Sequence, residues 1–95
     1  MKAEYIIIRE YIEHCRIEPQ FISLLEENGL IHIHEIENER FLHTEELANV
    51  ERYARMYYDL SINIEGIDAI HHLLKRIHHM QSEMKDLRNQ LRFLE

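Results

Sequence analysis

The sequence contains one cysteine, one proline, two glycines and no tryptophan in 95 residues. A single cysteine excludes an intramolecular disulfide and is typical of a reducing compartment. Apolar runs are also short: near the N-terminus only residues 5–8 form one, and Arg9 interrupts it. That run is far too short for a signal-peptide core or a membrane span. We therefore expect a cytoplasmic protein with a modest core.

The motifs of enzymes and of cofactor binding are missing as well. The sequence has no glycine-rich phosphate loop and no nucleophile elbow. Its lone Cys15 follows Ile8 and Tyr11 at helical spacing, so we expect this thiol on the buried face of the first helix. A buried thiol of this kind is structural rather than reactive. The sequence therefore predicts a protein that is not an enzyme and needs no cofactor.

Eight histidines raise the question of a metal site. The pairs His71-His72 and His78-His79 repeat after seven residues, which places them about 10 Å apart along a helix, too far to share one ion. Further towards the N-terminus, His34-Glu35 lacks the second histidine of a zinc-binding HExxH motif. We therefore predict solvated histidines and no metal site. Histidine titrates near neutral pH, so a pH response stays open, but the sequence singles out none of the eight.

The charge of the chain is unevenly distributed. The net charge is −7, and residues 1–51 carry 4 basic and 12 acidic side chains, which is −8. Residues 52–95 carry 7 basic and 6 acidic side chains, which is +1. An acidic surface repels phosphate backbones and attracts basic partners. The composition therefore argues against nucleic acid as the main ligand.

The C-terminal third carries the clearest pattern in the sequence. Written as heptads from Ile70, every a and d position to the end of the chain is apolar. Such a stripe is covered in a coiled coil by another copy of the helix or by a foreign helix. A helix over residues 64–95 would be about 48 Å long, more than the rest of the chain can cover. The predicted dimer interface, here called the seam, consists of Ile70, Leu73, Ile77, Met80, Met84, Leu87, Leu91 and Leu94.

Local signals mark the start of this helix. Asn63 is a good N-cap residue, because its side chain accepts a hydrogen bond from a first-turn amide. Ile62 and Ile67 have the spacing of a hydrophobic staple across the helix start. Gly66 is unfavourable in a helix, so we expect it to permit close packing of the backbone. We therefore divide the chain into a domain over residues 1–62 and a long helix over residues 63–95.

The N-terminal third predicts two short helices. Residues 5–8 are expected to form a brief strand or an extended lead-in, and residues 9–15 a helix. Pro19 stands where proline is tolerated, at the first position of a second helix. Gly29 suits the left-handed position that ends that helix. Two short helices joined by a tight turn form a helix-turn-helix.

A small hairpin, here called the wing, is predicted next. Residues 30–36 alternate between apolar and polar side chains, residues 37–39 form a turn, and residues 40–42 form the return strand. His43 or Thr44 then caps a third helix. The sequence therefore predicts a mainly α fold: a winged helix-turn-helix with a small β-hairpin wing and a long C-terminal coiled-coil helix.

The order of these elements and several of their residues resemble the MerR superfamily of winged helix-turn-helix proteins. Residues 17–19 (Ile-Glu-Pro) and 26–31 (Glu-Glu-Asn-Gly-Leu-Ile) look like the two ends of its second helix. Residues 40–47 look like the end of the wing followed by the capped third helix, and residues 61–67 look like the start of the fourth. The resemblance runs from about Tyr5 over nearly the whole chain and implies the same fold.

A narrower resemblance lies in the C-terminal half. Residues 57–77, YYDLSINIEGIDAIHHLLKRI, and residues 81–94, QSEMKDLRNQLRFL, look like the CbpM-type chaperone modulators, a branch of that superfamily. Members of this branch bind the J domain of a CbpA-type DnaJ homologue and inhibit its action with the DnaK-type chaperone. The resemblance implies that function, and a homodimer with antiparallel long helices. The g positions leave the orientation open, since Glu83 suits Arg76 in an antiparallel pair and Arg88 in a parallel one.

The face that would meet DNA in other members is acidic in this chain. DNA-binding members usually carry Arg and Lys on the second helix and the wing, where cations neutralise phosphates. Here the wing offers Arg40 alone, among carboxylates. J domains generally present a basic helix to their chaperone partner, and an acidic face would attract it. The predicted partner-binding residues, here called the acidic face, are Glu18, Glu26, Glu27, Glu35, Glu37 and Glu39.

Two other functions are compatible with the sequence. One is a dimeric transcription regulator of the MerR type, whose contacts to duplex DNA would come from Arg40, Arg52 or Arg55. The carboxylates around them make nucleic acid the less favoured partner. The other is a bare coiled-coil adaptor, in which residues 64–95 alone would bind the partner.

Overall fold

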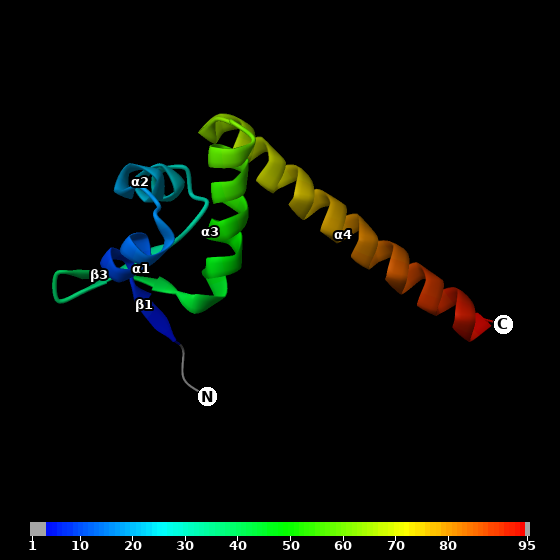
Figure 1. Ribbon diagram of the computed structural model, residues 1–95. Coiled ribbons are helices and arrows are strands. Elements are labelled where there is room, and N and C mark those ends of the chain that lie inside the picture. Colours follow the sequence, from blue (N-terminus) through cyan, green and yellow to red (C-terminus); the bar gives the residue numbers. More distant parts are fainter. Residues whose placement is uncertain (1–3, 95) are drawn as a thin grey trace.

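The structure is a computed structural model that describes residues 4–94. A small N-terminal body contains three strands and three short helices, and the long helix α4 (Ile64–Leu94) carries the chain away from it (Figure 1). The described part is accordingly elongated, with extents of 57 × 37 × 21 Å. The predicted mainly helical architecture is confirmed. No helix within residues 4–94 is both long and apolar enough to cross a membrane.

The helix-turn-helix consists of α1 (Ile8–Cys15) and α2 (Pro19–Glu27). Arg16 turns the chain between them in the left-handed conformation, with φ 56°, and its amide donates to Ile12 O. This conformation costs a non-glycine residue about 1 kcal/mol, so the turn is fixed by its surroundings rather than by propensity. Pro19 occupies the first turn of α2, as predicted.

The end of α2 is a Schellman motif. Gly29 has φ 73°, its amide donates to Glu26 O at 3.0 Å, and the amide of Leu30 donates to Leu25 O at 2.9 Å. The left-handed residue reverses the chain and satisfies carbonyl groups that the helix leaves unpaired. Leu30 and Ile31 then enter the core in an irregular segment, so the first wing strand begins three residues later than predicted.

The wing is formed by β2 (Ile33–Ile36) and β3 (Glu39–His43), and β1 (Tyr5–Ile7) adds a third strand. All pairs are antiparallel and the order is β1-β3-β2. Glu37 and Asn38 have φ 51° and 66°, the left-handed pair that suits a two-residue hairpin. The turn is therefore one residue shorter than predicted, and β3 lies in the middle of the sheet rather than at its edge.

The third helix, α3 (Leu47–Ala54), follows a 3-10 turn over Thr44–Glu46. Of the two predicted caps the structure uses His43, whose Nδ1 accepts a hydrogen bond from the Glu45 amide at 3.0 Å. After α3 the chain continues as a π-helical segment over Arg55–Asp59. No feature of the sequence predicts that the helix widens to π turns here. Such π turns are frequent near functional sites.

The predicted start of α4 is confirmed. Asn63 Oδ1 accepts a hydrogen bond from the Gly66 amide at 2.8 Å, which caps the helix. Ile67 is fully buried and Ile62 is half-buried, as expected of a staple. A Cβ placed on Gly66 would lie 2.7 Å from Ile62 Cγ2 and 3.2 Å from the Asn63 cap oxygen. Gly66 is therefore required by the close approach of the staple.

We expect Gly66→Ala to destabilise the protein by roughly 1 kcal/mol. Alanine gains about 1 kcal/mol in helix propensity, but the clash with the stiff β-branched Ile62 costs about 1–3 kcal/mol. Urea unfolding measures the difference, and Ser82→Ala on the exposed part of the same helix is the matched control. An unfolding midpoint for Gly66→Ala at or above the wild-type value would contradict the packing of this site.

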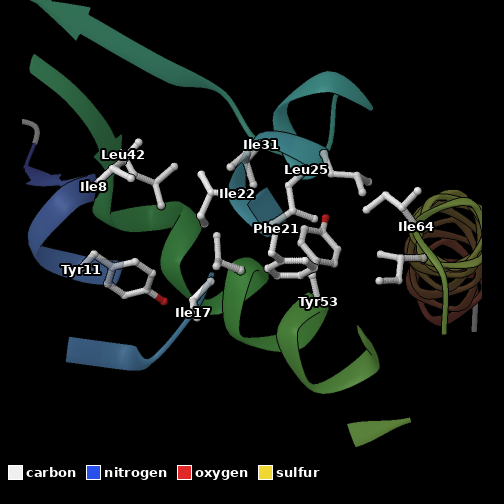
Figure 2. Packing of buried hydrophobic residues seen from close by; sticks show 13 residues of the cluster. Ile8, Tyr11, Ile17, Phe21, Ile22, Leu25, Ile31, Leu42, Tyr53 and Ile64 are labelled. Carbon is white, nitrogen blue, oxygen red and sulfur yellow. The ribbon is translucent and has the colours of Figure 1, made fainter. Parts of the chain in front are cut away.

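Thirteen apolar side chains from all layers form one core (Figure 2). Within residues 4–94 no charged or polar residue is buried. The prediction for Cys15 is wrong, because its side chain is exposed. The helix ends there, and after the left-handed turn the chain buries Ile17 instead. The core residues are Ile8, Tyr11, Ile17, Phe21, Ile22, Leu25, Leu30, Ile31, Leu42, Val50, Tyr53, Ile64 and Ile67.

Candidate functional site

The carboxylates of the acidic face lie along α2 and the wing. Glu26 and Glu27 are in the last turn of α2, and Glu35, Glu37 and Glu39 are on the wing. All are exposed except Glu39, which is half-buried. Glu18 is also exposed but precedes the first turn of α2, at the opposite end of that helix. The structure therefore groups the end of α2 with the wing and sets Glu18 apart.

Two ion pairs fasten the wing to the helix-turn-helix. Arg40 on β3 contacts Glu26 Oε1 at 2.9 Å, and Arg9 on α1 contacts Glu39 Oε1 at 3.2 Å. Their side chains are between 37% and 64% exposed, and pairs in such solvent contribute about 0–1 kcal/mol each. The two ion pairs matter mainly because they neutralise charges on this surface. Arg40, the cation of the wing, is already engaged by a carboxylate.

At the end of α2 and on the wing, three carboxylates of the acidic face remain uncompensated. Glu27, Glu35 and Glu37 are exposed and make no ion pair within residues 4–94. Helix α2 itself contains no Lys or Arg. Ile36 lies between two of these carboxylates at the tip of the wing and is 54% exposed. The wing therefore presents negative charge around one apolar side chain.

Glu18 has a partner that the sequence did not indicate. Its amide donates to the Tyr58 hydroxyl at 3.2 Å, and that hydroxyl is 3.5 Å from Glu18 Oε1. Burial raises the pKa of Tyr58, so the phenol stays neutral and able to donate. The Tyr58 ring also lies against Phe21, with centroids 5.3 Å apart. The π-helical segment therefore holds the start of α2 in place.

The seam on α4 is largely open to solvent. Ile70 is half-buried, whereas the seven seam residues from Leu73 to Leu94 are 42% to 82% exposed. Leu74 is half-buried, so the apolar stripe is wider near the body. Single exposed apolar residues are ordinary, but a continuous stripe at heptad spacing indicates an interaction surface.

Among the histidines of α4, the structure singles out one. His71 is half-buried, and the Tyr53 hydroxyl lies 3.0 Å from its Nδ1, so it is not the solvated side chain that we predicted. Burial lowers the pKa of His71, and His72, Lys75 and Arg52 lower it further while Asp68 opposes them. The sequence contained a signal: His71 follows the buried Ile67 by one helical turn, on the face that meets the body.

The His71 contact predicts a pH-dependent stability. The unfolded chain takes up the proton near pH 6.5, but folded His71 takes it up only at lower pH. The stability that neutral, half-buried His71 contributes to the fold is therefore fully present above pH 6.5, and it is lost as the pH falls below that value. Urea unfolding between about pH 5 and pH 7.5 measures this. We expect His71→Gln to remove part of the dependence of the unfolding free energy on pH, and the exposed His78→Gln to keep it. An equal dependence on pH in both variants would contradict the contact.

Two of the other three histidines of α4 contact carboxylates on its surface. His72 Nε2 lies 3.4 Å from Asp68, and His79 Nε2 lies 3.0 Å from Glu83, both one helical turn apart. Within residues 4–94, no three His, Cys, Asp or Glu side chains are placed together to hold a metal ion. These contacts are therefore local helix pairs.

Comparisons with known proteins agree with this fold. A sequence model described as MerR HTH family regulatory protein matches residues 6–89, which include the helix-turn-helix, the wing, α3 and most of α4. Neither the curated proteins nor the solved structures gave a match. Because the family model covers most of the chain, from the first strand to the seam, this protein belongs to the MerR HTH family of regulatory proteins.

Proposed function

We propose that this protein is a homodimeric chaperone modulator. It binds the J domain of a CbpA- or DnaJ-type co-chaperone and inhibits the action of that protein with a DnaK-type chaperone in the cytoplasm. The family membership and the CbpM-like segment over residues 57–77 support the proposal. The modulator catalyses no reaction, because covering the partner surface is sufficient to inhibit it.

The charge of α2 and the wing is the observation that carries the proposal. A DNA reader needs cations against phosphates and Arg, Lys, Asn or Gln at base edges. Here α2 contains no Lys or Arg, and Arg40 is held by Glu26 at 2.9 Å. Releasing Arg40 would expose a further carboxylate, so the pair cannot be exchanged for a phosphate contact without cost. This surface favours a basic protein over a nucleic acid.

Binding by occlusion follows from this surface. A basic helix of the J domain is attracted by the uncompensated Glu27, Glu35 and Glu37, which speeds the encounter. Charge on an exposed rim supplies little of the final affinity, so apolar contacts are needed as well. Ile36 at the wing tip is exposed and supplies one. A J-domain helix covered in this way is not accessible to the DnaK-type chaperone.

The seam supplies the dimer in this proposal. A 31-residue helix with an open apolar stripe gains stability when an identical stripe covers it. Two copies joined along α4 would present two acidic faces, one from each body. The alternative function is a dimeric DNA-binding regulator, with which the family match is equally compatible; it predicts binding to duplex DNA that weakens steeply with salt.

Charge reversal tests the acidic face. We expect the triple variant Glu27→Lys, Glu35→Lys and Glu37→Lys to bind the J domain at least about tenfold more weakly than wild type. None of the three makes an ion pair within residues 4–94, so the fold should be retained. Calorimetric titration measures the affinity and circular dichroism checks the fold.

The matched control changes the net charge by the same amount elsewhere. Glu4→Lys, Glu13→Lys and Asp86→Lys replace exposed carboxylates outside α2 and the wing. This variant should bind within about twofold of wild type, because long-range charge alone has a small effect at physiological salt. Equal losses in both triple variants would show general electrostatics rather than a docking face.

A further inference from the structure

The sheet of β1, β3 and β2 has one face towards the core and one face away from it. Residues that pair directly across strands point to the same face, and successive residues point to opposite faces. Ile6 and Ile33 both pair with Leu42, which is fully buried (Figure 2), so these three residues mark the core face. The opposite face, here called the outer face, carries six apolar or aromatic side chains: Tyr5, Ile7, His34, Ile36, Phe41 and His43.

The outer face is continuous and takes no part in the core. The Tyr5 ring lies 5.1 Å from the ring of His34 and 5.1 Å from that of His43, in T-shaped contacts, so it reaches over the middle strand β3. Ile7 and Phe41 pair beside it, and within residues 4–94 neither belongs to the core nor packs against it. Tyr5 is 43% exposed. A contiguous apolar surface of this kind indicates an interaction site.

The border of the outer face is acidic. Glu39 pairs with Ile36 across the hairpin and therefore shares this face, and Arg9 contacts its carboxylate at 3.2 Å. Glu37 follows Ile36 in the hairpin turn, and Glu45 follows the end of β3 by two residues. Both carboxylates are exposed. Within residues 4–94 this border therefore combines three carboxylates with one guanidinium group, which is already engaged.

The charge and the exposed ring select the partner. An acidic border repels phosphates, which disfavours a nucleic acid. It is complementary to an amphipathic helix with apolar side chains in the middle and Lys or Arg along the edges. Tyr5 adds a ring that such a cation can cover. We propose that the basic helix of the J domain packs on the outer face. This inference rests on the proposed function and supplies the apolar contacts which that function requires.

The proposal separates docking from attraction. Glu35 pairs with Arg40 and thus points to the other side of the sheet, and Glu27 lies on α2. Glu4, whose carbonyl accepts the Thr44 amide at 3.0 Å, also alternates to that side. These carboxylates lie outside the outer face. Glu27 and Glu35 therefore act on the association rate, as exposed charges near an interface usually do, whereas the outer face acts on the dissociation rate.

Surface plasmon resonance tests the proposal, with the full-length protein immobilised and the isolated J domain in solution. The double variant Tyr5→Ala with Ile36→Ala should weaken binding at least about tenfold, mainly by faster dissociation. Neither residue belongs to the core, so the fold should be retained, which circular dichroism checks. Tyr5→Phe keeps the ring and should bind within about twofold of wild type.

The matched control also removes one aromatic and one aliphatic side chain. Leu60→Ala with Phe93→Ala changes residues that are 64% and 91% exposed and lie outside the sheet. This variant should bind within about twofold of wild type, because a residue outside the interface contributes little to affinity. Equal losses in both double variants would overturn the inference.

The histidines of the outer face report the contact directly. Ring-proton NMR signals of His34 and His43 are assigned by comparison with His34→Gln and His43→Asn. These signals should shift or broaden when the J domain is added. The signals of His78 and His79, which are exposed on α4, should stay unchanged. The reverse pattern would place the partner on α4 and overturn the inference.

The outcomes distinguish this inference from the proposed function. A folded wild type that does not bind the J domain would overturn both. Wild-type affinity in the double variant Tyr5→Ala with Ile36→Ala would overturn the inference and leave the proposed function standing. If that variant keeps J-domain binding but sediments differently from wild type, the outer face joins two copies of this chain, and the inference is overturned as well.

Discussion

Replacing Phe21 by alanine is expected to lower the free energy of unfolding by about 3–5 kcal/mol, which is typical of a phenylalanine removed from a packed core. Phe21 is 1% exposed on α2, and its ring lies 4.8 Å from that of Tyr57 and 5.3 Å from that of Tyr58. A chain of this length has a total stability of roughly 5–14 kcal/mol. The substitution therefore removes a large share of it.

Phe21→Leu is the control for the Phe21→Ala experiment. Leucine keeps most of the buried volume and should cost about 1–2 kcal/mol, because only the aromatic contacts and part of the packing are lost. Both values come from urea unfolding followed by circular dichroism. A cost below about 1 kcal/mol for the alanine variant would contradict the position of Phe21 between α2 and the π-helical segment.

The second large effect concerns the proposed dimer. Wild type is expected to sediment as a dimer, and the double variant Met84→Asp with Leu87→Asp as a monomer. These residues are 56% and 58% exposed in the single chain, so the substitutions do not disturb the body. In a coiled coil they would bury four carboxylates without partners, which raises the dissociation constant by at least about 100-fold.

A monomeric variant should also lose helix. Within residues 4–94 the side chains of α4 from Lys75 to Leu94 are all exposed, and an isolated helical segment of that length is marginal in water. Ser82→Asp with Asn89→Asp, at the outward f positions, adds the same charge and should leave the dimer intact. Sedimentation of wild type as a monomer, or dissociation by both variants alike, would contradict the assignment of the seam.

The features that were predicted correctly depend on local signals. Pro19 can open a helix because its fixed φ and missing amide fit the first turn, and Gly29 can close one because it tolerates a left-handed φ. Asn63 caps α4 through a residue three positions along the chain. Each signal lies within a few residues of its effect. Sequence pattern is informative at that range, whatever the tertiary structure.

The features that were missed depend on contacts between distant residues. The pairing of β1 with β3 joins Ile6 to Leu42, and no pattern in residues 5–8 alone names that partner. The Tyr53–His71 contact is set by how α3 and α4 meet, and Cys15 is exposed because the core takes up Ile17 after the left-handed turn instead. The outer face of the sheet also depends on distant residues, because the helix-turn-helix separates β1 from β2 and β3 along the chain.

On the candidate interaction surfaces too, local patterns could be predicted and contacts between distant residues could not. The seam was predicted from a heptad repeat, which is a local pattern, and its residues from Leu73 to Leu94 are exposed in the single chain; its role as a dimer interface stays a prediction. The carboxylates of the acidic face were also readable as residues. The ion pairs that these carboxylates form were not predicted. Glu26 pairs with Arg40 and Glu39 pairs with Arg9, so fewer carboxylates on α2 and the wing lack a cation, and the cation of the wing is engaged.

Calorimetric titration of the dimer with the isolated J domain of the co-chaperone from the same cell tests the proposed function most directly. The titration is made at about 50 mM and about 300 mM salt, which changes the screening of exposed charges. We predict saturable binding that weakens at the higher salt, with no binding to duplex DNA under the same conditions. A folded, dimeric protein that does not bind the J domain, and that binds duplex DNA with a steep salt dependence, would contradict the proposal.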